Sequence, residues 1–278
     1  MKPLPQLDDA RLMQPSDDDR SRFGASYERL VGIMARLRGE NGCPWDREQD
    51  LGSLRAYLIE EAYEVLEAIE SDDAKHHAEE LGDLLLQVVF QAEIRRQEGL
   101  FDAADVAHGI CDKLVRRHPH VFGDTPAEGV AQAFGEWEKA KAKEKGGRSI
   151  VDGVPRALPA LLRAQRTGEK ASRVGFDWPD VSGALAKVKE EIAELEEAIA
   201  TKDKKEVEHE LGDLLFATVN VARFVQTGAE DALHAATERY RARFQYMEGR
   251  AKEQGLDMST MGLEALDVLW DEAKARKL

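Results

Sequence analysis

Cysteine is scarce in this 278-residue sequence, and its two copies, Cys43 and Cys111, fit neither a CxxC motif nor a zinc-ligand spacing. Two distant thiols of this kind are typical of a reduced, cytoplasmic protein. Aromatic residues make up only 6% of the chain. No segment approaches the roughly 20 apolar residues that span a bilayer, and residues 1–22, which resemble a flexible tail, lack an apolar signal stretch. The sequence therefore predicts a cytoplasmic protein with no membrane partner.

Basic residues are outnumbered, with 39 Lys and Arg against 54 Asp and Glu, which gives a formal charge of -15. A strongly acidic surface repels the phosphate backbone of nucleic acids, so no nucleic-acid partner is expected. A ligand that carries phosphate must instead be recruited through metal ions or a local basic patch. The abundant Ala, Leu, Glu and Lys favour helices, and no alternating strand pattern is evident, so the predicted fold is all-α.

An internal repeat organises the chain. Residues 60–89 and 190–219 align without a gap at an offset of 130 residues, and about half of the aligned positions are identical. Glycine and proline interrupt the helical pattern between the two copies. We therefore predict a first domain over residues 23–145, a linker over 146–159 and a second, related domain over 160–278.

Each copy contains the pattern of a helical hairpin. In the first copy an apolar stripe at helical spacing is formed by Leu58, Ala62, Val65 and Ile69. The segment 71–73 then ends this helix and caps the next one, which we expect over about residues 74–97. A connection this short makes the two helices antiparallel. Apolar residues surround most of the second helix, which predicts that it is buried on most sides.

Acidic residues converge between the two helices of each hairpin. An ExxE pair on the first helix faces an ExxD pair on the second, because residues three apart share one helix face. Four such carboxylates repel one another at the edge of a core, and divalent cations relieve the repulsion. Carboxylate oxygens suit Mg²⁺, Mn²⁺ or Ca²⁺ rather than zinc, and Mg²⁺ usually keeps several waters and shares itself with substrate phosphates. The predicted metal ligands are Glu61, Glu64, Glu80 and Asp83 in the first copy and Glu191, Glu194, Glu210 and Asp213 in the second.

These motifs resemble the MazG family of nucleoside triphosphate pyrophosphohydrolases, in its long two-domain form, over residues 23–278. The resemblance implies a homodimer of helical hairpins, Mg²⁺ held by the ExxE and ExxD carboxylates, and hydrolysis of nucleoside triphosphates between the α and β phosphates. The matching segments are GCPWD at 42–46, EEAYE at 60–64, ELGD at 80–83, RRHPHVFGD at 116–124, and the second EExxE and ELGD set at 190–194 and 210–213.

Cations and an aromatic ring are needed for the rest of a nucleotide. The second copy offers Lys187, Lys189, Arg239, Arg243, Trp270 and Lys274, and the first offers Lys113, Arg117, Trp137 and Lys141. The first copy has Tyr57 and Ile59 in place of the two lysines, so the second copy is expected to be the more active one. Glu190 and Glu60 stand next to the metal ligands and are candidates for orienting or deprotonating water, and Glu190 also for nucleotide binding. No residue is identified that selects a base, so broad specificity is expected.

Two other classes of protein compete with this interpretation. A helical di-iron protein would carry a Glu-x-x-His motif on each of two helices, but here the spacing from Glu206 to His209 is not duplicated. A non-enzymatic helical protein could use its acidic faces to bind basic partners and would need neither metal nor nucleotide. His76, His77 and His209 are expected at the surface rather than as ligands.

Overall fold

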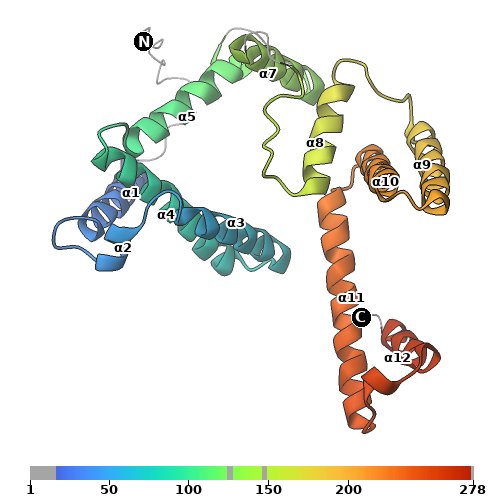
Figure 1. The fold of residues 1–278 in the computed structure, drawn as a ribbon. Helices are drawn as coiled ribbons and strands as arrows, with labels where there is room; N and C mark the ends of the chain where they lie inside the picture. Colours follow the sequence, from blue (N-terminus) through green and yellow to red (C-terminus); the bar gives the residue numbers. More distant parts are fainter. Residues whose placement is uncertain (1–16, 124–127, 146–148, 277–278) are drawn as a thin grey trace. The chain divides into compact units, whose positions relative to one another are not determined.

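The computed structural model describes residues 17–123, 128–145 and 149–276, and within them every regular element is a helix (Figure 1). The predicted all-α class is thus confirmed. Residues 1–16 of the predicted tail, residues 146–148 of the predicted linker and Asp124 lie outside the described residues. Helix α1 begins at Asp17, so the last residues of the segment expected as a tail are helical. No described helix combines the length and the apolar character that crossing a bilayer requires.

The chain divides into two compact units, residues 1–146 and 147–278. The first unit contains α1 (Asp17–Leu37), α2 (Pro44–Glu48), α3 (Leu54–Ser71), α4 (Ala74–Gln97), α5 (Ala103–Arg117), α6 (Pro119–Phe122) and α7 (Val130–Lys145). The second contains α8 (Ala160–Ser172), α9 (Val181–Thr201), α10 (Lys204–Phe224), α11 (Ala229–Glu253), a short 3-10 helix (Met258–Thr260) and α12 (Leu263–Ala275). Each unit thus places a leading helix before a hairpin and a second helix pair after it.

The hairpins form where the sequence predicts them. Helices α3 and α4 pack together, as do α9 and α10. Asp73 caps α4 by accepting hydrogen bonds from the backbone N–H groups of Lys75 and His76, at 2.9 and 3.2 Å. Asp203 caps α10 by accepting a hydrogen bond from the backbone N–H of Lys205, at 2.9 Å. Two residues join the helices in each copy, so the antiparallel arrangement is fixed by the length of the turn.

The core of the first unit lies where α1 and α3 meet α4. Met34, Leu54, Val89, Phe90 and Ile94 form its buried cluster. In the second unit α8 packs on α10 and α11, and a separate cluster joins α11 to α12. The hairpins are therefore anchored on one side by a neighbouring helix.

The opposite side of each hairpin is apolar but exposed within the chain. Leu81, Leu85 and Val88 on α4 are 47%, 41% and 38% exposed, and Leu211 and Leu215 on α10 are 46% and 49% exposed. The expectation that the second hairpin helix is buried on most sides is wrong for the single chain. Apolar residues that encircle a helix indicate that it can be covered on several sides, but not that the same chain supplies the cover.

Candidate active site

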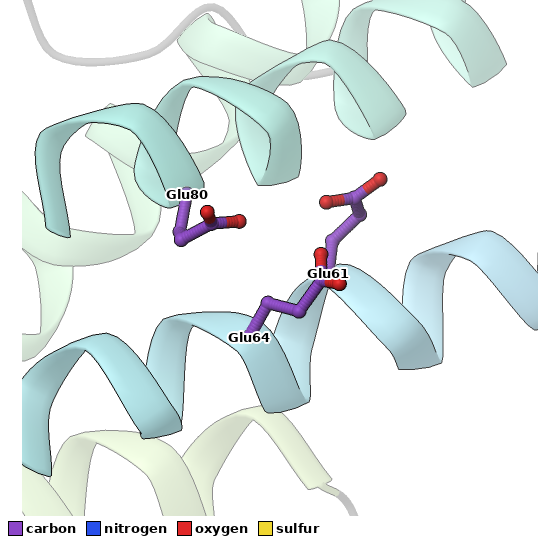
Figure 2. Close-up of side chains that lie close together, drawn as sticks. All are labelled: Glu61, Glu64 and Glu80. Atoms are coloured by element: carbon purple, nitrogen blue, oxygen red, sulfur yellow. The ribbon is translucent and has the colours of Figure 1, made fainter. Parts of the chain in front are cut away.

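The first hairpin brings carboxylates from two helices together. Glu61 and Glu64 project from α3 and Glu80 from α4, and the three side chains point toward one another between the helices (Figure 2). One oxygen from each of the three lies within 4.8 Å of the others. The ExxE spacing places its two acids on adjacent turns of one face, and the short turn brings Glu80 opposite them.

The electrostatics of this cluster favour a cation. Partial burial raises the pKa of Glu61, and the nearby negative charge of Asp83 raises it further, followed by the charge of Glu64. Asp83 is therefore close enough to act on Glu61, although its oxygens lie outside the 4.8 Å group. His76 Nδ1 lies 3.2 Å from Glu80 Oε1, and the His76 side chain is 45% exposed. The four acids predicted for this site thus share one neighbourhood.

The second hairpin contains two overlapping acidic groups. Glu190, Glu191 and Glu194 form one, and Glu191, Glu210 and Asp213 form the other, each with one oxygen per residue within 4.8 Å of the others. Glu191 belongs to both groups and is only 2% exposed. Its Oε2 atom is buried without a hydrogen-bond partner among the described residues. A buried carboxylate oxygen with no donor is costly, and a bound cation would satisfy it.

Lys187 lies against this second group, one helical turn before Glu191. Its Nζ is 2.7 Å from Glu190 Oε1 and also forms an ion pair with Glu191. These two carboxylates raise the pKa of Lys187. Desolvation raises the pKa of Glu194, and the negative charge of Glu191 adds to this effect. The second site is therefore as acidic as the first but contains one internal cation.

The residues predicted to bind the nucleotide lie partly on the hairpins and partly on the helix pairs that follow them. In the first unit, Arg117 and Lys141 stand over the ring of Trp137, at 5.7 and 4.4 Å from its centroid. Arg117 also donates to Glu144, which accepts from Arg116 as well. Glu144 therefore already neutralises part of this cationic patch, and Arg117 in turn lowers the pKa of Glu144.

The second unit repeats this arrangement on α11 and α12. Arg243 stands 5.6 Å from the centroid of the Trp270 ring, and Tyr240 packs 5.1 Å from the same ring. Trp270 is partly buried and packs against the α11–α12 core cluster, so it has a packing role. Lys274 lies 3.1 Å from Asp271. Lys113, Lys189 and Arg239 are exposed, as is Glu60.

Sequence reasoning missed four contacts of these sites: Lys187 with Glu191, His76 with Glu80, His209 with Asp213 and Arg117 with Glu144. A spacing of four residues separates Lys187 from Glu191, and likewise His76 from Glu80 and His209 from Asp213. This spacing could have predicted the three contacts, because residues four apart are neighbours on a helix. His209 lies 3.5 Å from Asp213 and is 71% exposed. No histidine belongs to the acidic groups that the described residues form, which disfavours the di-iron alternative. The Arg117–Glu144 contact joins residues 27 positions apart and left no local signal.

The fold and the sites define a class of all-α proteins with duplicated helical hairpins, each of which carries an acidic cluster suited to a divalent cation. The model of the MazG nucleotide pyrophosphohydrolase domain matches residues 49–122 and 181–247, so it covers both hairpins. The chain belongs to this family, as the motifs predicted.

Named relatives agree with the family match along nearly the whole chain. The nucleoside triphosphate pyrophosphohydrolase/pyrophosphatase MazG of Thermotoga maritima is 46% identical over 253 residues, which are 90% of this chain and 96% of the relative. The nucleoside triphosphate pyrophosphohydrolase of Escherichia coli K12 is 45% identical over 257 residues, or 90% of this chain and 98% of the relative. The uncharacterized protein YabN of Bacillus subtilis is 47% identical over 251 residues, which are 89% of this chain but 51% of YabN.

Proposed function

We propose that the protein hydrolyses nucleoside triphosphates, both NTPs and dNTPs and with broad base specificity, to nucleoside monophosphate and pyrophosphate in a Mg²⁺-dependent reaction. The observation that carries the proposal is the buried Glu191, whose Oε2 has no hydrogen-bond partner among the described residues although its side chain belongs to both acidic groups of the second hairpin. Membership of the MazG family and the names of two relatives that span the chain support the reaction type.

The donor set fits magnesium, with manganese as a substitute. Carboxylate oxygens dominate both clusters, and hard divalent cations prefer such ligands. Glu191, Glu194, Glu210 and Asp213 would hold the cation in the second unit, and Glu61, Glu64, Glu80 and Asp83 would hold it in the first. When bound, the cation would supply positive charge against the phosphate oxygens and make a nearby water more acidic.

In the second unit we assign Glu190 the role of orienting the attacking water and accepting its proton. Glu60 is its counterpart in the first unit. Glu190 is an exposed member of the group that it forms with Glu191 and Glu194, so its carboxylate can accept a proton while its neighbours hold the cation. The water oxygen forms a new bond to the α-phosphorus. The bond from the α-phosphorus to the oxygen that bridges the α and β phosphates breaks, and pyrophosphate departs with that electron pair. Glu190→Ala should lower turnover more than it weakens Mg²⁺ binding.

Cationic and aromatic side chains of the second unit are proposed to hold the triphosphate and the base. Trp270 presents an aromatic ring beside Arg243, a combination that suits stacking together with phosphate contact. We assign the second unit the greater activity, because the first has Tyr57 and Ile59 in place of Lys187 and Lys189. The other proposed contacts are Lys187, Lys189, Arg239 and Lys274, with Lys113, Arg117, Trp137 and Lys141 as the weaker set of the first unit.

A second copy of the chain is proposed to cover the exposed apolar faces of the hairpins. Ile59, Leu66, Leu81, Leu85 and Val88 are between 38% and 57% exposed. Their spacing places the α3 residues on one side of that helix and the α4 residues on one side of the other, and exposed apolar faces of this kind mark an interaction surface. Leu85→Glu should shift the sedimentation of the protein from dimer towards monomer. Leu100→Glu, at an exposed leucine outside the hairpin helices, is the control.

The decisive experiment is a panel of NTPs and dNTPs with Mg²⁺ in which pyrophosphate and orthophosphate are measured separately. Pyrophosphate and monophosphate should appear together, and excess EDTA should abolish both. Glu191→Gln should reduce the rate by about a hundredfold or more, because the cation that would stabilise charge on the reacting phosphate loses its most buried ligand. Glu197→Gln removes an exposed acid from the same helix and should leave the rate unchanged. Orthophosphate as the first product would contradict the proposed cleavage position.

A further inference from the structure

The two acidic clusters differ in one buried contact. In the second hairpin the Lys187 ammonium group forms ion pairs with both Glu190 and Glu191. Its partner Glu191 has a side chain that is only 3% exposed, whereas Lys187 is 37% exposed. The lysine therefore approaches the cluster from the solvent side and contacts the most buried carboxylate. Its flexible stem allows the ammonium group to move away without any change in the helix.

The corresponding position of the first hairpin carries no charge. Tyr57 stands four residues before Glu61, and its ring packs edge-on against Trp45 with the centroids 6.0 Å apart. Across the described parts of the chain, no lysine or arginine forms an ion pair with Glu61, Glu64 or Glu80. Among the residues that the structure describes, the half-exposed His76 lies 3.2 Å from Glu80. The repeat has thus produced two clusters with the same acids, one with an internal counter-ion and one without.

We propose that Lys187 is a resident counter-ion of the second cluster, which occupies the position of a divalent cation beside Glu191 and leaves when the cation binds. This inference rests on the proposed function. An ammonium group and a divalent cation repel each other and compete for the same buried carboxylate, because Glu191 belongs to both acidic groups of this hairpin. The displaced ammonium group is then free to contact the triphosphate.

Two consequences follow for the metal affinity of the two sites. Without nucleotide, the second cluster binds a divalent cation less tightly than its acids alone would, because the cation must displace Lys187. With nucleotide, the phosphates give Lys187 an alternative partner, so cation and triphosphate favour each other's binding. The first cluster lacks this coupling, since Tyr57 cannot compete with a cation.

The test measures Mn²⁺ binding without nucleotide, from the electron paramagnetic resonance signal of free Mn²⁺. A background of Glu61→Gln with Glu64→Gln silences the first cluster, so the titration reports the second. In this background Lys187→Met should tighten Mn²⁺ binding by about three- to tenfold, the range set by the loss of a competing, partly exposed ion pair. Lys205→Met removes the same charge from the same hairpin and should leave the affinity unchanged.

The reciprocal variant moves the lysine to the other copy. In a background of Glu191→Gln with Glu194→Gln, Tyr57→Lys should weaken Mn²⁺ binding at the first cluster by about three- to tenfold. Circular dichroism of each variant verifies that the helices are retained.

The outcomes separate the inference from the function on which it rests. If Lys187→Met left Mn²⁺ binding unchanged or weakened it, the lysine would not compete with the cation and the inference would be wrong, while the metal site would stand. If neither the background with the second cluster intact nor its Lys187→Met variant bound Mn²⁺, the proposed metal site itself would fail, and the counter-ion role with it.

Discussion

Replacing Glu61 with glutamine should make the metal-free protein more stable at neutral pH. Glu61 is partly buried, and the negative charges of Asp83, Glu64 and Glu80 all act on it. Repulsion between Glu61 and one neighbouring carboxylate at about 4–5 Å costs about 1 kcal/mol in water. The total repulsion is limited because Glu61 can take up a proton and become neutral. We therefore expect a gain of about 1 kcal/mol, which corresponds to a rise of about 4 °C in the melting temperature for a unit of this size.

The pH dependence of this gain follows from the direction of the pKa shift. The folded protein raises the pKa of Glu61 above the ordinary value of 4.5. Folding therefore favours the protonated acid, and the wild type loses stability as the pH rises from about 4.5 through the raised pKa of the folded state. Below pH 4.5 the wild type and Glu61→Gln should be equally stable, and the advantage of the variant should be complete once Glu61 is ionised in the folded protein.

Calorimetry of the protein in EDTA and in Mg²⁺ tests this reasoning. At a Mg²⁺ concentration of about 100 times the dissociation constant, the first unit of the wild type should gain about 2.7 kcal/mol, and Glu61→Gln should lose most of that gain. Glu67→Gln changes an exposed acid on the same helix and serves as the control. A variant that melted below the wild type in EDTA at pH 7 would refute the claim that Glu61 is held among repelling charges.

Three further changes probe other parts of the structure. Asp177→Asn removes the partner of Arg223, which donates to Asp177 at 2.6 and 2.7 Å and lowers its pKa below 3.8. It should cost about 1–2 kcal/mol at pH 7 in a urea titration, and the difference should vanish as acid protonates Asp177 in the wild type below pH 3.8. Trp270→Ala should raise KM for ATP about tenfold, and Trp270→Phe should restore most of the affinity, since a phenyl ring still stacks; equal loss in both would argue against stacking. Asp73→Ala should lower stability by about 1 kcal/mol in the same urea assay because α4 loses its cap, and an unchanged midpoint would show that the cap is dispensable.

Helix capping and the spacing of apolar residues made the helices predictable from the sequence. The helix expected over about residues 74–97 is α4, Ala74–Gln97, and Asp73 caps it as its position before an apolar pattern indicated. The stripe expected on the preceding helix is right for Leu58, Ala62 and Val65, which are half-buried, but Ile69 is 54% exposed and its neighbour Ala68 is buried instead. A shift of one position near the end of a helix is enough to exchange such neighbours.

Burial and long-range partners were harder to predict than the helices. The three-residue spacing predicts that Glu61 and Glu64 share one helix face. The burial of Glu191, which is 2% exposed, depends instead on how α9 and α10 pack together. The helix faces that carry Leu85 and Leu215 are exposed but as apolar as a buried face. The sequence therefore could not distinguish an apolar face buried within the chain from one that is left exposed. The contact between Arg117 and Glu144 depends on the angle between α5 and α7, which no short motif encodes.

The two-residue turn of each hairpin has a consequence for how this protein can change over time. Asp72 and Lys202 occupy the same place in the two turns, and both adopt left-handed backbone angles, with φ of 54° and 61°. One residue added to either turn would rotate the following helix by about 100° and swing its acids away from those opposite. Insertions there would separate the acids of the proposed cation site while leaving a stable helix pair, which accounts for two hairpins that differ at half of their aligned positions and yet align without a gap across the turn.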